Sequence, residues 1–456
     1  MLFRSAIALT ALVLLAGGCT RSEPTPRNAI LITIDTLRAD HLGCYGYDRE
    51  TSPRIDELAS RSLRFANAVS VSSWTLPAHA SLLTGLYPAE HGVQTDVNAL
   101  PPSASTIAAE LREHGFDTFA AVSHVYLSRR WGFDKGFTTF EESAGFGAPQ
   151  MAVAERIVDS GIEWLEEPGR DDPFFMWLHI FDPHWDYAPP APYDDLFDPD
   201  YRGSIDGTYQ SLAPYIKAVR GYTEPPPLAP ADLDHIEALY DGEIAYVDAH
   251  IGRLLDRLRT SGLEEETLVV IVSDHGEEFM EHGSLEGHQW TLYDEVVMVP
   301  LIIHVPGTKS GRVIDQVVST VGVAGTILDL LGFDSARPNL SEAVGRAGGE
   351  PGRDGSIPAA LLDLTVRRGR RQLGLRSQEY KLIRYEQDPM ELFADPQPGR
   401  EQHDLAGSER DVANGMSHTI DRRLREMNRL SDAGVERLPM SAAVQQRLRA
   451  TGYLDD

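Results

Sequence analysis

Short, almost continuously apolar runs recur along the chain and restrict its fold more than any other feature. These runs are Ala29–Ile34, Phe119–Ser123, Phe174–Ile180, Thr267–Ser273 and Leu301–Val305. A strand is apolar on consecutive positions when helices cover both faces of its sheet. In contrast, the segment Tyr240–Leu258 has apolar residues at helical spacing. This alternation predicts an α/β fold with a parallel or mixed sheet sandwiched by helices.

The chain is long enough for a large domain with an appendage, and a change in composition separates the two. Residues 335–357 are rich in Gly, Pro, Arg and Ser. We therefore expect a large α/β domain over residues 28–340 and a smaller C-terminal α+β subdomain over 357–456. Within the second unit, Leu373–Tyr385 predicts antiparallel strands, and a helix and a tail follow.

The charge and the cysteine content exclude several classes of function. With 41 basic and 69 acidic residues, the net charge is −28, which disfavours nucleic acid as a partner. Two cysteines exclude a disulfide scaffold and a cysteine-based zinc site. An anionic substrate would therefore need local cations, such as metals, His or Arg.

The first 27 residues have the pattern of an export signal. Residues 1–18 combine Arg4 with an apolar stretch and small residues directly before Cys19, and they resemble a bacterial lipoprotein signal. Ala16 stands where Leu is usual in such signals, and a plain secretory signal is the alternative. We expect Cys19 to be acylated, with residues 19–27 as a tether. Localisation to the bacterial cell envelope follows, at the outer membrane or in the periplasm.

Polar residues follow three of the predicted strands, where ligands bind in open α/β sheets. Asp35 follows the first run, Asp274 and His275 follow the run at 267–273, and His179, Asp182 and His184 end the run at 174–180. Each residue alone is explained equally well as a cap or a core hydrogen-bonding group. Together they form a set of Asp and His side chains that suits a divalent metal.

A fourth feature is the segment that starts at Thr75 and ends at Gly85. Thr75 precedes Pro77 and a short apolar stretch, which predicts that it lies at a helix N-terminus, where an anion is favoured. Thr75 is either an N-cap or a nucleophile whose oxygen is deprotonated by a metal. The neighbouring metal-ligand pattern favours the nucleophile.

Six stretches, in order, resemble the sulfatase family of the alkaline-phosphatase superfamily. They are ILITIDTLRADHLGCYG at 30–46, TLPAHASLLTGLYPAEHGV at 75–93, LHIFDPHWDY at 178–187, YDGEIAYVDAHIGRLLDRL at 240–258, VSDHGEEFMEHGSLEGHQWTLYDE at 272–295 with PLIIHVPG at 300–307, and EYKLIRYEQDPMELFADPQ at 379–397. The resemblance implies a large α/β domain, a small antiparallel sheet, and a metal-dependent hydrolase of sulfuric or phosphoric esters.

The resemblance also implies roles for single residues. Asp35, Asp274 and His275 match metal ligands, and Thr75 takes the place of the Cys or Ser that becomes formylglycine. His184 matches a histidine that contacts the substrate or protonates the leaving group, and His288 falls where many members have a substrate-binding Lys. His79 replaces the Arg of the maturation motif, and His124 is a weaker match; we expect both to bind substrate.

The departures from the family pattern are chemically coherent. Thr75 cannot yield formylglycine, because its β-carbon carries a methyl group. A sulfated Thr has no easy exit, whereas a phosphorylated Thr is hydrolysed by water, which shifts the expectation toward phosphate-type esters. We expect covalent catalysis by Thr75, with His184 or His288 as the proton donor.

The sequence does not decide the identity of the metal or the substrate, nor does it decide between hydrolysis and two alternative functions. The cofactor is a divalent metal, Ca, Zn or Mn, and a second metal held by His184, His288 and Asp182 is conceivable. The expected substrate is a small anionic ester or a sulfated or phosphorylated glycan or lipid. The alternatives are a phospho-group transferase of the envelope and a non-catalytic lipoprotein that binds anionic glycans.

Overall fold

The computed structural model describes residues 25–142, 153–219, 226–344 and 360–439, with short gaps at 367–369, 387, 396–398 and 429–435, and also residues 442 and 445. The predicted signal peptide, Cys19 and most of the tether lie outside the described residues. In the described part of the chain, no helix is both long and apolar enough to cross a membrane.

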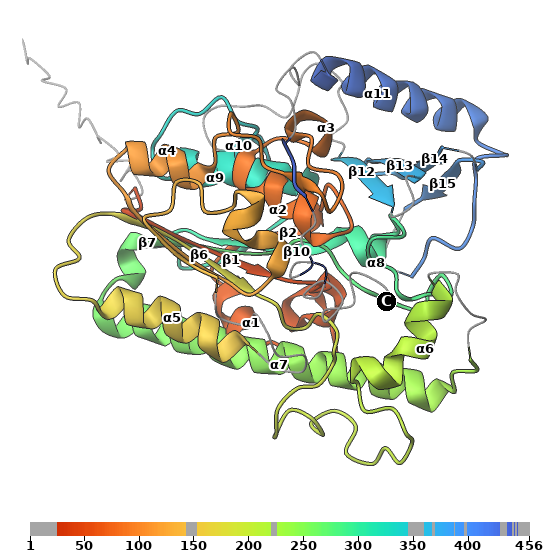
Figure 1. The fold of residues 1–456 in the computed structure, drawn as a ribbon, viewed down its shortest axis with the longest axis horizontal. Coiled ribbons are helices and arrows are strands. Elements are labelled where there is room, and N and C mark those ends of the chain that lie inside the picture. Colours follow the sequence, from red (N-terminus) through yellow and green to blue (C-terminus); the bar gives the residue numbers. More distant parts are fainter. Residues whose placement is uncertain are drawn as a thin grey trace, which may run out of the picture.

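A mixed eight-stranded sheet forms the centre of the protein (Figure 1). Its strands are β1 (Asn28–Ile34), β2 (Leu63–Val69), β4 (Asp117–Val122), β5 (Thr139–Glu141), β6 (Phe174–Ile180), β7 (Thr267–Ser273), β10 (Met298–His304) and β11 (Arg312–Ser319). The order is β11-β2-β10-β7-β1-β6-β4-β5, and β10 is antiparallel to both of its neighbours. All other pairs in this sheet are parallel. The predicted α/β class is confirmed.

Helices cover both faces of this sheet (Figure 1). The helices of the large domain are α1 (Pro53–Ala59), α2 (Thr75–Thr84), α3 (Pro88–His91), α4 (Ile107–Glu113), α5 (Ala154–Glu166), α6 (Tyr209–Val219), α7 (Pro230–Ser261), α8 (Asp294–Val297), α9 (Val323–Leu330) and α10 (Ser341–Val344), of which α2, α4 and α9 pack on one face of the sheet and α1, α5 and α7 on the other. Short 3₁₀ turns lie at Ala39–His41, Gly43–Tyr45, Val125–Leu127, Arg129–Trp131, Glu264–Glu266 and Thr320–Gly322.

The side chains of β1 show why a continuous apolar run is needed here. Ala29 and Leu31 pack into the core shared with α2, α4 and α9, whereas Ile30 and Ile32 pack into the core shared with α1, α5 and α7. Successive side chains of a strand point to opposite faces, so a central strand must be apolar at every position. The composition of β1 therefore fits its central position, where it lies between β6 and β7.

The C-terminal region forms a second, smaller sheet beside the first (Figure 1). The antiparallel strands β12 (Ala360–Val366), β13 (Arg370–Arg376), β14 (Tyr380–Tyr385) and β15 (Glu391–Ala394) are followed by helix α11 (Arg410–Asn428). Beyond α11, β16 (Glu436–Arg437) pairs with β3 (Asn98–Ala99) of the first unit. The tail after α11 thus returns to the large domain, because this strand pair joins the two units.

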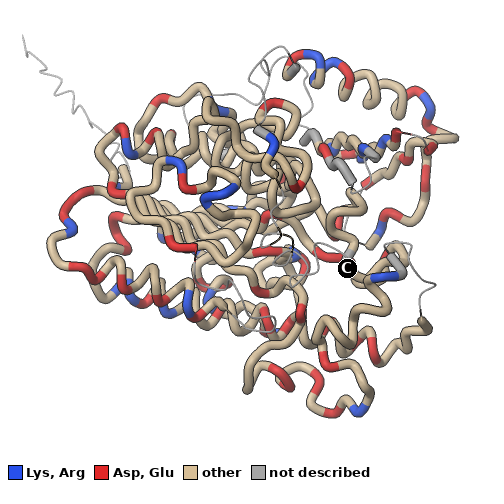
Figure 2. Tube along the Cα trace, viewed as in Figure 1, with Lys and Arg blue, Asp and Glu red and all other residues tan. Residues whose placement is uncertain are grey.

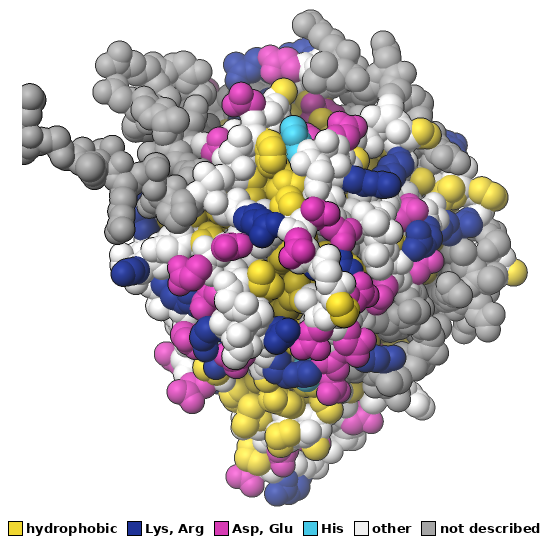
Figure 3. All heavy atoms as spheres, turned by 90° about the vertical axis from the view of Figure 1, so that its left-hand side faces the viewer, with side chains coloured by type: hydrophobic (Ala, Val, Ile, Leu, Met, Phe, Trp, Pro, Cys, Tyr) yellow, Lys and Arg dark blue, Asp and Glu magenta, His cyan; other side chains and the backbone are white. Residues whose placement is uncertain are grey.

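Charged residues lie mainly on the helices and loops, and few lie on the central strands (Figure 2). On one face of the molecule, basic and acidic side chains are interspersed around small apolar areas (Figure 3). Mixed charge of this kind is typical of a soluble surface.

Candidate active site

Asp35, Asp274 and His275 meet at the carboxyl edge of the central sheet. Ile34 at the end of β1 pairs with Ser273 at the end of β7, which places the residues that follow them side by side. All three side chains are fully buried. One ligand atom from each lies within 4.8 Å of the others. The parallel register thus assembles the predicted metal ligands at the edge where α/β sheets bind ligands.

The two carboxylates leave three oxygen atoms unpaired. Asp274 Oδ1 accepts hydrogen bonds from the amides of Thr36 (3.3 Å) and His275 (2.9 Å). In contrast, Asp274 Oδ2 and both carboxylate oxygens of Asp35 are buried and have no hydrogen-bond partner in the described part of the chain. Burial raises the pKa of Asp35 to about 6, although His275 and His288 oppose the shift. Unpaired buried carboxylate oxygens that converge in this way fit a divalent cation.

His275 and Thr75 complete this set. The His275 Nδ1–H donates to the Gly276 carbonyl at 3.0 Å, so Nε2 carries the lone pair, as is typical of a metal-ligating histidine. Nε2 lies 3.3 Å from Thr75 Oγ1 and 3.6 Å from Asp35 Oδ1. Thr75 is the first residue of α2, at the end where the helix dipole favours an anion. The structure therefore brings Asp35, Thr75, Asp274 and His275 together.

The loop after Asp35 is held by groups that the sequence analysis did not identify. The Tyr240 hydroxyl donates to the Thr36 carbonyl at 2.7 Å and accepts from the Arg38 amide at 2.9 Å. Thr36 has a φ of 52°, which is costly for a β-branched residue. These bonds, together with the one from Thr36 to Asp274, hold Asp35 at the sheet edge.

Six buried histidines form a chain of neighbouring rings around the site. Ring centroids are separated by 4.9 Å for His79–His179, 6.2 Å for His124–His179, 6.3 Å for His124–His184, 4.9 Å for His184–His288 and 5.1 Å for His275–His288. Burial lowers the pKa of His79 to about 3 and that of His179 to about 4. Burial, followed by His288, also lowers the pKa of His184. These three imidazoles are therefore neutral at pH 7 in the ligand-free protein.

The two candidate proton donors differ in their partners. His184 Nδ1 lies 2.9 Å from the Trp185 carbonyl, whereas His288 Nδ1 lies 2.8 Å from the carboxylate oxygen Oε1 of Glu277. Glu277 is fully buried and was not identified from the sequence. Its position two residues after His275 was the available signal. A carboxylate beside an imidazole stabilises positive charge on the ring, so His288 is the better placed donor.

The two predicted substrate-binding residues, His79 and His124, belong to this group of six histidines. His79 follows Thr75 by one helical turn, and its Nδ1 lies 2.9 Å from the Thr75 carbonyl and 3.4 Å from Asp274 Oδ2. His124 Nδ1 accepts a hydrogen bond from the Tyr126 amide at 3.0 Å. Their contact with a substrate stays a prediction.

Asp182 does not join the site in the way that a second metal would need. Its carboxylate accepts hydrogen bonds from the amides of Val153 (2.9 Å) and Ala154 (2.8 Å) at the start of α5. Asp182 thus caps a helix, and the second metal site that we considered loses its carboxylate. His179 lies closer to the site than expected, with Nε2 3.4 Å from Asp35 Oδ2.

Comparison with known proteins places this geometry in a family. The sulfatase family model matches residues 27–333, which is most of the large domain. The chain belongs to the sulfatase family. The family match covers the strands that carry Asp35, Asp274 and His275, and Thr75 at the start of α2.

Sulfatases from distant organisms are similar to this chain. The ulvan-active sulfatase of Formosa agariphila is 27% identical over 337 residues, covering 68% of this chain and 62% of that protein. Human iduronate 2-sulfatase is 26% identical over 355 residues, covering 66% of this chain and 64% of that protein. The chain thus spans less than two thirds of the length of these two sulfatases.

Solved structures share the fold at lower identity. One is a complex with its substrate D-glucosamine-2-N,6-O-disulfate, with a TM-score of 0.72, 20% identity, and 90% of this chain and 99% of that chain covered. Another is the phosphonate monoester hydrolase of Agrobacterium radiobacter, with a TM-score of 0.68, 21% identity, and coverage of 88% and 96%. These structures confirm the mixed sheet with a separate small antiparallel sheet.

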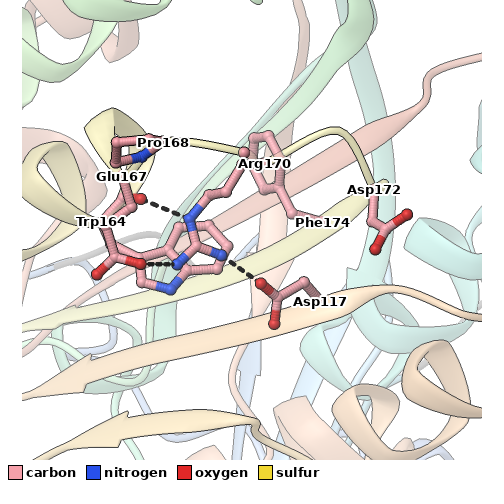
Figure 4. Close-up of a pocket in the computed structure, with 8 residues that line it drawn as sticks. Asp117, Trp164, Glu167, Pro168, Arg170, Asp172 and Phe174 are labelled. Carbon is pink, nitrogen blue, oxygen red and sulfur yellow. Dashed lines mark hydrogen bonds and ion pairs between the residues drawn. The ribbon is translucent and has the colours of Figure 1, made fainter.

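A cavity of ≈ 220 Å³ lies at the other end of the sheet (Figure 4). Asp117 and Phe174, which begin β4 and β6, line it together with Arg170. Arg170 bonds to Asp117 and Glu167 and lies over the Trp164 ring. The carboxyl ends of the same strands face the site of Asp35, Thr75, Asp274 and His275, which is called the sulfatase site below after the family match. The cavity lies at the amino ends and is therefore separate from that site.

Proposed function

We propose that this sulfatase-family protein is a metal-dependent ester hydrolase in which Thr75 is the nucleophile and phosphate-type esters are preferred over sulfate esters. The observation that carries the proposal is the position of Thr75 Oγ1, 3.3 Å from His275 Nε2 at the start of α2. An unmodified hydroxyl occupies the place of formylglycine, and its β-methyl group prevents that modification.

Asp35, Thr75, Asp274 and His275 would hold the divalent metal. Their buried, unpaired carboxylate oxygens and the Nε2 lone pair of His275 fit a cation. When bound, this ion lowers the pKa of the nucleophile and neutralises the anionic ester. The mixed oxygen and nitrogen donors favour Zn or Mn over Ca, although Ca stays a candidate.

The residues of this chain then account for two chemical steps. The Thr75 hydroxyl gives its proton to solvent, Thr75 Oγ1 attacks phosphorus in line, and the bond from phosphorus to the leaving oxygen breaks. His288 gives its Nε2 proton to that oxygen, and Glu277 on Nδ1 stabilises the charge. Water, which gives a proton back to His288, then attacks phosphorus, and the bond from phosphorus to Thr75 Oγ1 breaks and releases phosphate. Relatives act on sulfated glycans such as ulvan, so we propose a small anionic ester or a sulfated or phosphorylated glycan or lipid as the substrate.

The test is hydrolysis of matched nitrophenyl esters by the metal-supplemented protein. We expect Thr75→Ala to lower kcat roughly 10³-fold or more, because the attacking oxygen is lost. Thr75→Ser keeps the oxygen and should retain a measurable part of the activity. Phosphate, phosphodiester or phosphonate esters should react faster than the aryl sulfate, and mass spectrometry should find unmodified Thr75.

Three outcomes would contradict parts of this proposal. Near wild-type rates in Thr75→Ala would mean that water attacks directly. A clear preference for aryl sulfate would restore sulfate esters as the substrate class. Lack of turnover on all four esters would favour a protein that only binds anionic glycans.

We also propose a lipid anchor at Cys19, on the basis of the signal-like residues 1–18. Cys19→Ser should move the protein from the membrane fraction to the soluble fraction, while the kcat for the nitrophenyl ester stays unchanged. Fractionation followed by immunoblotting measures this change. A Cys19→Ser protein that remains with the membranes would disprove the anchor.

A further inference from the structure

A second group of metal-ligating side chains lies outside the sulfatase site. It is formed by Glu278, His282 and Glu295, whose ligand atoms lie within 4.8 Å of one another. Glu278 begins a hairpin of β8 (Glu278–Phe279) and β9 (Leu285–Glu286), and Glu295 lies on α8. Both glutamates are fully buried. The three residues therefore connect the hairpin to α8.

The orientation of His282 resembles that of a metal ligand. Nε2 lies 3.0 Å from the Glu401 carbonyl, to which an Nε2–H can donate. This leaves Nδ1 facing Glu295 Oε1 at 2.5 Å. A histidine that ligates a metal through one nitrogen usually donates its other N–H to a carbonyl or carboxylate. At this separation the two atoms share a proton, and a metal ion bound by both atoms would replace that proton.

The charge of the group also indicates a missing cation. Among the described residues, neither Glu278 nor Glu295 forms an ion pair with Lys or Arg, and His282 pairs with Glu295 alone. Glu278 Oε1 accepts from the amides of His282 (3.0 Å) and Ser284 (2.8 Å), whereas its buried Oε2 has no hydrogen-bond partner. Two buried carboxylates against one imidazole carry an excess negative charge.

Two kinds of cation can neutralise this group. Burial, aided by Glu295, raises the pKa of Glu278 to about 7, so a proton on Glu278 is one solution. Although burial disfavours the imidazolium, Glu295 raises the pKa of His282 to about 9. A divalent ion replaces both protons and also uses the unpaired Glu278 Oε2.

We propose that Glu278, His282 and Glu295 bind a divalent first-row transition ion such as Zn²⁺. One imidazole and two carboxylates form a mixed nitrogen and oxygen donor set that suits Zn²⁺ better than Ca²⁺ or Mg²⁺. The ion ties the hairpin to α8, and the Glu401 carbonyl orients His282 from the C-terminal region. The same hairpin leads to His288, and Glu277 precedes Glu278 directly. The site thus supports the histidine that faces the ester, without itself contacting the substrate.

The test measures zinc binding by the full chain. It uses a double variant, Asp35→Ala with Asp274→Ala, that lacks two ligands of the sulfatase site and is called the background protein. After removal of metals with a chelator and reloading with Zn²⁺, we expect about one zinc per chain by elemental mass spectrometry. Adding Glu278→Gln should reduce this to near zero, whereas the matched exposed change Glu265→Gln should not. Zinc should also raise the Tm of the background protein by several degrees.

Wild-type protein provides a measurement that does not depend on the folding of any variant. Titration of the chelator-treated wild type with Zn²⁺ should reveal two binding steps, and X-ray absorption of the zinc-loaded background protein should show nitrogen and oxygen ligands that include one imidazole. A single binding step in the wild type, together with no zinc in the background protein, would overturn the proposal and leave a proton on Glu278. Both measurements record zinc binding and not ester hydrolysis. The outcome of this test therefore does not depend on whether the proposed hydrolase activity is found.

Discussion

Thr36 and Tyr240 illustrate how single residues set the geometry of the sulfatase site. Thr36 directly follows Asp35, and its amide donates to Asp274, while its buried Oγ1 has no hydrogen-bond partner among the described residues. Its φ of 52° is maintained by the Tyr240 hydroxyl. The backbone of Thr36, and not its side chain, therefore helps to position Asp35 and Asp274.

The raised pKa of Asp35 predicts that metal binding depends on pH. Burial raises its pKa from 3.8 to about 6, so the folded apoprotein retains a proton that a metal must displace. The same shift means that this group stabilises the apoprotein below about pH 4 and that this stability is lost as pH rises to 6. We expect the metal Kd to rise at least about tenfold for each pH unit below 6.

Calorimetric titration of the apoprotein with Mn²⁺ between pH 5 and 8 measures this dependence. Asp35→Asn serves as the control, because its residual affinity should lack the contribution of this proton. A wild-type affinity that is constant from pH 5 to 7 would contradict the shifted pKa of Asp35.

At the scale of elements, the Asp182 carboxylate connects the loop that carries His184 to the start of helix α5. Asp182 accepts from the Val153 and Ala154 amides, which are otherwise unsatisfied at a helix N-terminus. Glu243 on α7 accepts from the Ala188 amide at 3.0 Å, at the other end of this loop. The loop that carries His184 is therefore fixed between α5 and α7.

Replacement of Asp182 should destabilise the protein through this cap. We expect Asp182→Ala to lower the free energy of unfolding by about 1–2 kcal/mol, since an N-terminal capping group is lost. Urea unfolding followed by circular dichroism measures this loss. Asp200→Ala, at a position where the side chain is 97% exposed, should change stability by less than about 0.5 kcal/mol. Equal stability of the two variants would refute the capping role.

For the whole molecule, a buried ion-pair group joins the small sheet to the large domain. Lys381 on β14 lies 2.6 Å from Asp294 Oδ1 on α8 and 3.0 Å from Glu401 Oε1. All three side chains are almost completely buried. Arg376 on β13 lies 3.4 Å from Asp294 Oδ2. The two units are thus connected through α8, which also carries Glu295.

Loss of the Lys381 charge should therefore affect the whole fold. Lys381→Met leaves Asp294 and Glu401 without their shared cation, and we expect a loss of about 3–5 kcal/mol in the free energy of unfolding. Lys309→Met, at an exposed position, is the control and should have little effect. Differential scanning calorimetry would show a lower Tm for Lys381→Met alone, and an unchanged Tm would show that the ion pair contributes nothing to stability.

Local sequence patterns determined the central strands and the residues directly after them. The predicted runs at Phe174–Ile180 and Thr267–Ser273 match β6 and β7, because burial on both faces demands an apolar residue at every position. In the same way, Thr75 could be placed at a helix start from its neighbours alone. Strands β2 and β11 were not predicted, since their partly exposed side chains lack a continuous apolar pattern.

Only the tertiary structure decided which polar groups pair with one another. Glu277 with His288, Tyr240 with Thr36, and Asp182 with α5 are contacts that local periodicity does not record. Periodicity reflects which face of an element is buried, whereas the partner of a buried polar atom depends on the order and register of the strands. For this reason the sequence alone determined the metal-ligand candidates of this sulfatase-family protein. The fold decided that Asp182 caps a helix and that Glu278, His282 and Glu295 lie together.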